Sequence, residues 1–108
     1  MSASRLPLCL GILSIALIAG PAVASPPDIL ATKAGCTACH AKDKKLVGPS
    51  YHDVAAKYQG SPGAAADLAA KVRSGGKGVW GTVPMPAADA KKVSDADLAS
   101  IIAWILKQ

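Results

Sequence analysis

The sequence is short of large apolar side chains, although 51% of its residues are hydrophobic. Its 108 residues include no Phe, two Trp and two Tyr, so aromatic residues make up only 4%. A chain of this length is enough for one small domain. Because so small a domain buries little surface, an underfilled core leaves it with little stability of its own. We therefore expect a large apolar group, which the sequence does not encode, to complete the core.

Acidic residues are also scarce. The chain has 7 of them, all Asp, against 12 Lys and Arg, and its formal net charge is +5. No basic stretch is interleaved with aromatic residues, so nothing in the sequence favours binding to nucleic acid. A net positive surface favours encounter with acidic surfaces of protein partners instead.

Only one long hydrophobic run is present, near the N-terminus. Residues 8–19 form an apolar run of 12 residues, whereas a membrane-spanning helix needs roughly 20. Arg5 is the only charge before this run, and Gly20-Pro21 ends it. The small residues Ala22-Val23-Ala24 follow. A basic start, an apolar run and an A-x-A ending are typical of a secretory signal peptide.

We expect the signal peptide to span residues 1–24 and the mature domain to span residues 25–108. The alternative is an uncleaved membrane anchor, which the shortness of the run disfavours. Removal of 24 residues leaves a domain of 84, with 11 basic and 7 acidic residues and a net charge of +4. The mature protein is then expected in the periplasm, as a monomer without stable insertion in the membrane.

Cysteine is rare, and its placement is informative. Of 3 Cys, Cys9 leaves with the signal peptide, and the domain keeps Cys36 and Cys39. Together with His40 they form the C-x-x-C-H pattern of haem attachment. Two thiols three residues apart on one helical turn can reach the two vinyl groups of one porphyrin, and His40 then lies under the iron. We predict one covalently attached haem c, which is the apolar group that the core lacks.

Two other interpretations of the cysteine pair fit less well. A redox disulfide of the C-x-x-C type would need a thioredoxin-like strand pattern nearby, and the sequence has none. A zinc site would need a second pair of ligands. The mature domain has no further Cys, and His52 is its only other histidine.

Methionine is as scarce as cysteine. Once the initiator residue is removed with the signal peptide, Met85 is the only thioether in the domain, and it lies between Pro84 and Pro86. Each proline restricts its own backbone φ, which suits a side chain that is held in place as a ligand. We predict Met85 as the sixth ligand of the iron, opposite His40. The competing candidate is His52, and a thioether ligand would raise the reduction potential relative to a second histidine.

The order of Gly, Pro and apolar residues predicts an all-α domain of about four helices. The first begins near Asp28 and runs into the cysteine motif, the second begins at Ser50, and the third covers roughly residues 64–73. The fourth begins at Ser94, which is followed three positions later by an acidic residue, as in a helix cap. Its apolar stripe consists of Leu98, Ile101, Ile102, Ile105 and Leu106. The loop of about 20 residues before it, 74–93, is long enough to be functional.

Three further segments resemble the short class I bacterial cytochromes c. They are Leu46-Val47-Gly48-Pro49, residues 53–58 and residues 78–86, the last of which contains the predicted methionine ligand. That family comprises monohaem periplasmic carriers that serve nitrite reductase and terminal oxidases. The resemblance covers the whole mature domain. It implies a helical fold in which the first and last helices cross.

The resemblance also implies roles for residues around the haem. The Pro49 carbonyl would accept the ring N–H of His40 and so fix its tautomer. Trp80 would donate to a haem propionate, and Lys71 would be the second propionate partner. Family members usually carry an amide side chain three residues after the ligand methionine, which donates toward its sulfur. Here that position is Ala88 and the loop before the last helix is longer, so the fine tuning of the methionine is expected to differ.

These features predict an electron carrier and not an enzyme, because the protein fills both axial positions of the iron. The expected partners are redox proteins with acidic docking surfaces, such as nitrite reductase, a terminal oxidase, a peroxidase or a cytochrome bc1-type donor. One alternative is a haem enzyme subunit or a gas or redox sensor in which Met85 is displaceable. Another is a cytochrome subunit held in a larger complex. The basic residues that follow the haem motif or bracket the methionine loop are Lys42, Lys44, Lys45, Lys71, Arg73, Lys77, Lys91 and Lys92.

Overall fold

The computed structural model describes residues 15–21 and 23–108. Its elements in chain order are α1 (Pro27–Lys33), the 3-10 turn η1 (Cys36–Ala38), α2 (Tyr51–Tyr58), α3 (Ala64–Ser74) and α4 (Asp95–Ile105). The described residues form no strand, and their β-type pairing is limited to isolated bridges between His40 and Lys45 and between Gly76 and Met85. The predicted all-α class with about four helices is confirmed.

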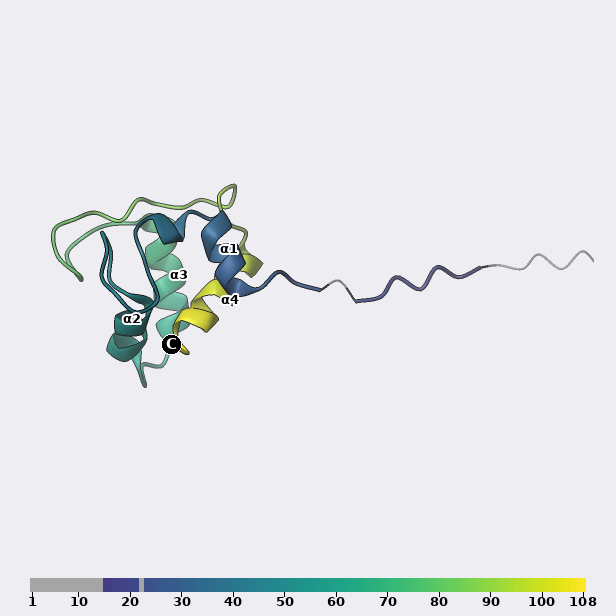
Figure 1. Ribbon diagram of the computed structural model, residues 1–108, viewed down its shortest axis with the longest axis horizontal. Coiled ribbons are helices and arrows are strands. Elements are labelled where there is room, and N and C mark those ends of the chain that lie inside the picture. Colours follow the sequence, from purple (N-terminus) through teal and green to yellow (C-terminus); the bar gives the residue numbers. More distant parts are fainter. Residues whose placement is uncertain (1–14, 22) are drawn as a thin grey trace, which may run out of the picture.

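The helices form one body that a long loop crosses. In Figure 1, α1 and α4 lie together at the end from which the N-terminal tail leaves, and α2 lies at the opposite end. The loop between α3 and α4, drawn in green, runs over the body from the side of α2 to the side of α1. This loop therefore covers one face of the helical body and brings residues distant in sequence close to α1.

The core lies between α1 and α4. Ala31 of α1 is 1% exposed, and Ile101 and Ile102 of α4 are each 2% exposed. The small side chain of Ala31 lets the two helices approach closely, and burial of each large side chain contributes about 1.5–3 kcal/mol. The cluster is completed by Leu30, Ala34, Val93 and Leu98, with Leu68, Ala69 and Val72 of α3 packed against it. The first and last helices thus pack on each other, in agreement with the fold that the resemblance implies.

Serine side chains begin α2 and α4, as the sequence predicts. The Ser50 hydroxyl accepts the backbone N–H of Asp53 at 3.0 Å, and the Ser94 hydroxyl accepts that of Asp97 at 3.2 Å. Each contact satisfies an N–H group that has no acceptor inside its helix, and such a cap contributes about 1 kcal/mol. The predicted start of the third helix at residue 64 also agrees with α3.

The prediction that the first helix runs into the cysteine motif is wrong. α1 ends at Lys33, and the motif begins in the separate turn η1. The reason is Gly35, which has a φ of 85°, in the left-handed region that ends helices and that glycine adopts without strain. The chain therefore changes direction between α1 and Cys36.

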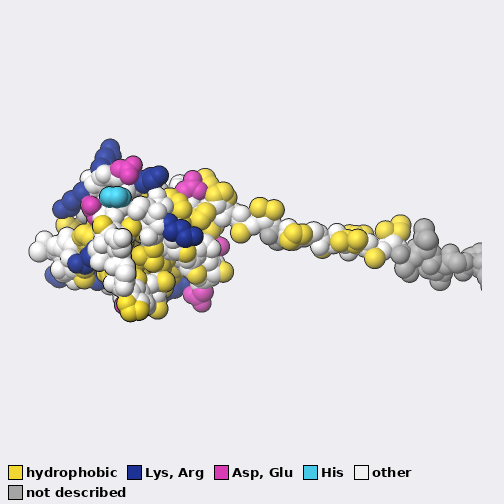
Figure 2. Space-filling view, turned by 90° about the horizontal axis from the view of Figure 1, so that it is seen from below, with side chains coloured by type: hydrophobic (Ala, Val, Ile, Leu, Met, Phe, Trp, Pro, Cys, Tyr) yellow, Lys and Arg dark blue, Asp and Glu magenta, His cyan; other side chains and the backbone are white. Residues whose placement is uncertain are grey.

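Most of the predicted signal peptide, residues 1–14 and 22, lies outside the described residues. Its described part extends away from the domain as a tail with apolar side chains (Figure 2). The large apolar residues of this tail are 80–96% exposed: Ile15, Leu17, Ile18 and Val23. They are therefore not part of the core. Within the described residues, no helix combines the length and the apolar character that crossing a membrane requires.

Candidate functional site

The cysteine motif forms a single tight turn. The backbone N–H groups of Cys39 and His40 both donate to the carbonyl of Cys36, at 3.2 and 2.9 Å. Both cysteines are free thiols and partly buried. Burial raises the pKa of the Cys36 thiol, and a backbone hydrogen bond and the Lys92 ammonium oppose this more weakly. A catalytic C-x-x-C thiol has a lowered pKa instead, so this turn does not have the electrostatics of a redox disulfide motif.

The ring of His40 is held in one orientation. Its Nδ1 lies 2.7 Å from the carbonyl oxygen of Pro49. Because a carbonyl can only accept, Nδ1 carries the proton and donates, and the lone pair of Nε2 is left free for a metal ion. Gly48 leaves room for the ring, since a Cβ at this position would lie 2.5 Å from His40 Cε1. The loop between η1 and α2 thus presents the imidazole with one nitrogen available.

Tyr51 supports the other side of this imidazole. Its ring stacks on His40 with the centroids 5.7 Å apart and 18° between the planes, and Trp104 of α4 meets it edge-on at 5.2 Å. Tyr51 is only 4% exposed, and its buried hydroxyl has no hydrogen-bond partner among the residues that the structure describes. Burial, and to a smaller extent the nearby Cys36 thiol, raises the pKa of Tyr51 to about 12. The sequence pattern places Tyr51 directly after the cap Ser50 but does not indicate its contact with His40, which depends on how the loop before α2 folds.

Met85 is held against the end of α3. Its N–H donates to the carbonyl of Gly76 at 2.8 Å, and its carbonyl accepts the N–H of Gly76 at 3.0 Å. Gly75, at the end of α3, makes this approach possible, since a Cβ there would lie 2.5 Å from the Met85 carbonyl oxygen. The side chain of Met85 is half-buried. The flanking prolines and this two-bond bridge together fix the backbone from which the thioether projects.

The residues expected beside the propionates lie near this loop. The Lys71 ammonium nitrogen is 3.2 Å from the place that a Cβ on Gly76 would take, so it lies next to the Met85 bridge. Trp80 is 41% exposed, and the ammonium of Lys57 from α2 lies 5.3 Å from its ring centroid. This cation–π contact, worth about 0.5–1 kcal/mol at an exposed site, ties the loop to α2. Sequence reasoning missed Lys57, because nothing local relates it to Trp80.

His52, the competing ligand candidate, lies in the first turn of α2 with an exposed side chain. Its backbone N–H donates to the carbonyl of Lys42 at 3.0 Å. The structure therefore places His52 on the surface of α2, one residue beyond Tyr51, whose ring contacts His40.

The loops that carry His40 and Met85 both expose large apolar side chains. Outside the N-terminal tail and Ile29, every large apolar side chain exposed in the described residues lies on one of these two loops: Leu46, Val47, Val79, Trp80 and Val83. Exposed apolar side chains gathered on two loops are typical of a surface that a ligand or a partner covers. Two thiols on one turn, a free imidazole nitrogen, an unpartnered buried hydroxyl and this apolar surface all fit a haem. The fold and the site thus define a small all-helical haem protein.

Comparisons with known proteins agree with this class. The sequence profile of the family described as Cytochrome c matches residues 29–108. Cytochrome c-551 of Pseudomonas aeruginosa is 47% identical over 92 residues, which cover 85% of this chain and 86% of that protein. Cytochrome c-552 of Hydrogenobacter thermophilus is 43% identical over 94 residues, which cover 87% of this chain and 93% of that protein. The crystal structure of wild-type Nitrosomonas europaea cytochrome c552 matches with a TM-score of 0.69 at 46% identity, covering 74% of this chain and 96% of that chain.

The chain belongs to the cytochrome c family. It is a class I monohaem cytochrome c similar to the c-551 and c-552 proteins, with one haem c attached through Cys36 and Cys39. It is an electron-transfer protein and not an enzyme. The predicted family, cofactor and non-enzymatic class are thereby confirmed.

Proposed function

We propose that this cytochrome is a periplasmic carrier of single electrons, with His40 and Met85 as the axial ligands of the haem iron. The observation that carries the proposal is the orientation of His40. Its Nδ1 donates to the Pro49 carbonyl, so Nε2 is the free nitrogen on the same turn as both thiols. When bound, the haem supplies a one-electron ferric/ferrous couple. The protein holds the imidazole rigidly, so little rearrangement has to accompany a change of charge.

Two observations support Met85 as the second ligand. It is the only thioether of the mature domain, and its backbone is fixed by the Gly76 bridge and two prolines. A soft thioether favours ferrous iron, so this ligand suits a carrier with a raised reduction potential. A ligand held in both redox states also keeps exogenous molecules from the iron, as electron transfer without catalysis requires.

We infer that Trp80 and Lys71 bind the two haem propionates. Lys71 lies next to the Met85 bridge, and the Trp80 indole is held by Lys57. An ammonium and an indole N–H are both donors, which carboxylates can accept. Lys57 also brings a positive charge to this edge of the site.

The partners that this charge pattern favours are redox proteins with acidic docking surfaces. The mature domain carries 11 basic and 7 acidic residues, and Figure 2 shows Lys and Arg side chains at several places on the face that it draws. Complementary charge speeds encounter more than it raises affinity, which suits a carrier that must dissociate after each transfer. Nitrite reductase, a terminal oxidase, a peroxidase and a cytochrome bc1-type donor are the candidate partners, and we expect the carrier to act as a monomer.

The mature protein is expected to begin at Ser25, because Ala22-Val23-Ala24 is the small-residue site at the end of the apolar run. The described part of the tail contributes no side chain to the core, so we expect cleavage to leave the domain intact. The intact mass of protein purified from periplasm should correspond to residues 25–108 plus one covalently bound haem. A mass that retains Cys9 would contradict cleavage and favour a membrane-anchored form.

Gly48→Ala tests the observation on which the proposal depends. A Cβ at Gly48 would lie 2.5, 2.9 and 3.0 Å from three atoms of the His40 ring, so either the ring or the backbone of residue 48 has to shift, which strains the bond from Nδ1 to the Pro49 carbonyl. We expect loss of low-spin character in the ferric spectrum at neutral pH. Pro49→Ala is the matched control, because it retains the carbonyl oxygen and should preserve the spectrum. A Gly48→Ala protein with an unchanged low-spin spectrum would count against His40 as the fixed ligand.

A further inference from the structure

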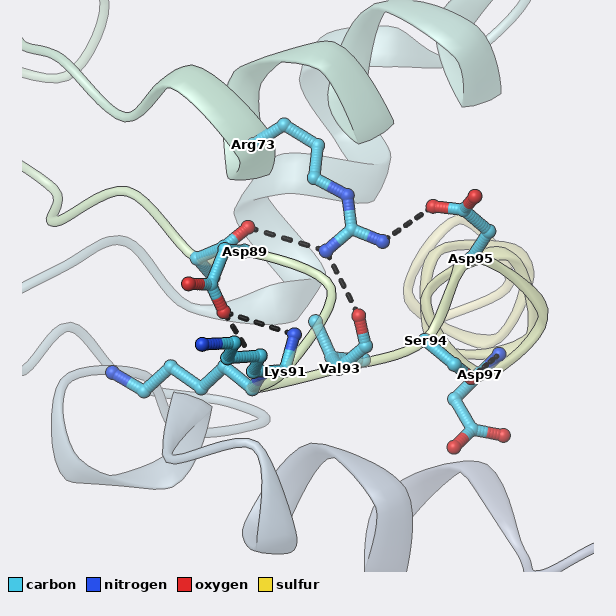
Figure 3. A network of polar contacts seen from close by, with 9 residues as sticks. Arg73, Asp89, Lys91, Val93, Ser94, Asp95 and Asp97 are labelled. Carbon is cyan, nitrogen blue, oxygen red and sulfur yellow. Dashed lines mark hydrogen bonds and ion pairs between the residues drawn. The ribbon is translucent and has the colours of Figure 1, made fainter.

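Arg73, in the last turn of α3, reaches three acceptors on the chain that follows Met85. Its Nη1 donates to the carbonyl oxygens of Ala88 at 3.2 Å and Val93 at 2.8 Å, and its Nη2 donates to Asp95 Oδ1 at 2.5 Å. Figure 3 shows the guanidinium between the loop and the first turn of α4, with dashed lines to both. One side chain thus ties α3, the methionine loop and α4 together.

The segment after Met85 forms a turn of its own around Asp89. The Asp89 carboxylate accepts the backbone N–H groups of Lys91 and Lys92 at 3.0 and 3.1 Å, and its backbone carbonyl accepts those of Lys92 and Val93. These bonds shape the turn but do not place it relative to the helices. Its placement has to come from contacts with α3 and α4.

Ala88 is where the turn is attached to α3. Its N–H donates to the carbonyl of Val72 at 2.9 Å, and its own carbonyl accepts from Arg73. Val72 and Arg73 of α3 therefore bond the backbone N–H and the backbone carbonyl of Ala88, which lies three residues after Met85. With the Gly76 bridge at Met85 itself, the loop is held to the end of α3 at two successive points.

We propose that Arg73 is a positioning residue for Met85, which holds the methionine loop through the carbonyls of Ala88 and Val93. This inference rests on the proposed role of Met85 as an axial ligand. Ala88, three residues after Met85, has no polar side chain that could restrain the ligand directly. Here the restraint acts on the backbone of that same residue from outside the site.

The hydrogen bonds of Arg73 to the two backbone carbonyls, and not its ion pair with Asp95, are the contacts that hold the methionine loop. The side chain of Asp95 is 93% exposed and that of Arg73 only 25%, so water screens the ion pair strongly. The bonds to the Ala88 and Val93 carbonyls are partly buried. The contacts use two nitrogens of the guanidinium, Nη1 and Nη2, whereas an ammonium has its three donors on a single nitrogen, so Lys does not reproduce all three contacts.

Binding of imidazole to the ferric holoprotein tests this role, because imidazole has to displace the methionine sulfur. We expect Arg73→Met to tighten imidazole binding at least tenfold. Arg73→Lys keeps the positive charge and is less disruptive to folding, and we expect it to tighten imidazole binding at least threefold. Asp95→Asn should stay within twofold of the wild type. Ile101→Val, which lowers stability in the α1–α4 core away from the loop, should also stay within twofold.

Three results would overturn the inference. The first is an imidazole affinity of Arg73→Met within twofold of that of the wild type. The second is an imidazole affinity that rises equally in Ile101→Val at matched stability. The third is an imidazole affinity that rises as much in Asp95→Asn as in Arg73→Met. The far-red band of sulfur-bound ferric haem separates this inference from the proposed function. If the ferric wild type lacks the band, Met85 is not the ligand, and the role proposed for Arg73 is wrong as well. A wild type with the band and an unresponsive Arg73→Met variant rejects the role of Arg73 alone.

Discussion

Met85→Ala is expected to abolish the weak far-red charge-transfer band of the ferric protein and to lower the reduction potential. The band arises from a thioether sulfur bound to low-spin ferric haem, and the mature domain has no other thioether. Loss of the soft ligand destabilises ferrous iron relative to ferric iron. We expect a fall of more than about 59 mV, which is a tenfold change in a one-electron equilibrium. The visible spectrum and a spectroelectrochemical titration measure both effects.

His52→Ala is the control for this result. His52 is exposed on α2, so its removal should leave the spectrum and the potential nearly unchanged. Loss of low-spin character in His52→Ala, with none in Met85→Ala, would show that the ligand assignment is wrong. Rapid binding of carbon monoxide by the untreated ferrous wild type would contradict a firmly held sixth ligand and, with it, the proposed carrier mechanism.

Replacing both Cys36 and Cys39 by Ala is expected to leave the chain largely unfolded. A small domain is stable by only about 5–15 kcal/mol. Burying a large apolar side chain stabilises the folded state by up to about 1.5–3 kcal/mol, and this is lost when the side chain is left uncovered. The loops around the site carry five such side chains: Leu46, Val47, Val79, Trp80 and Val83. Loss of the group that covers them therefore removes free energy of the same order as the total. Thermal unfolding followed by circular dichroism should show low helicity and no cooperative transition.

Thr37→Ala is the matched control, because Thr37 lies between the two cysteines with an exposed side chain. It should retain covalent haem and melt cooperatively, like the wild type. A stable apoprotein with native helicity in the double Cys variant would show that the helices alone supply the stability.

The elements whose signals are local were predictable from the sequence. Ser50 and Ser94 begin their helices because each side chain accepts an N–H only three residues away. The stripe of α4 is buried where its period of 3.6 residues predicts. The C-x-x-C-H motif is likewise local, since one turn of backbone brings its groups together. Helix starts, the covalent cofactor and the family could therefore be predicted, whereas the roles of Met85 and Trp80 stay predictions.

The remaining features depend on how distant segments pack. Gly35 ends α1 before the motif, and a glycine alone does not reveal which sign of φ the surrounding chain will require. Likewise, the contacts of Tyr51 with Trp104 and of Lys57 with Trp80 join residues far apart in the sequence. In the sequence, Arg73 is only one of several basic residues near the methionine loop, and no local pattern indicates its contacts.

Composition and short-range pattern thus determined that this chain is a helical domain around a covalent haem, because thiol spacing, helix caps and apolar period act within a few residues. Only the tertiary structure decided what supports the two proposed ligands. Arg73 reaches acceptors 15 to 22 residues away, and His40 is held between the Pro49 carbonyl and the Tyr51 ring. Such contacts exist only after α3, α4 and the loops have packed, since backbone geometry brings together only near neighbours in the chain.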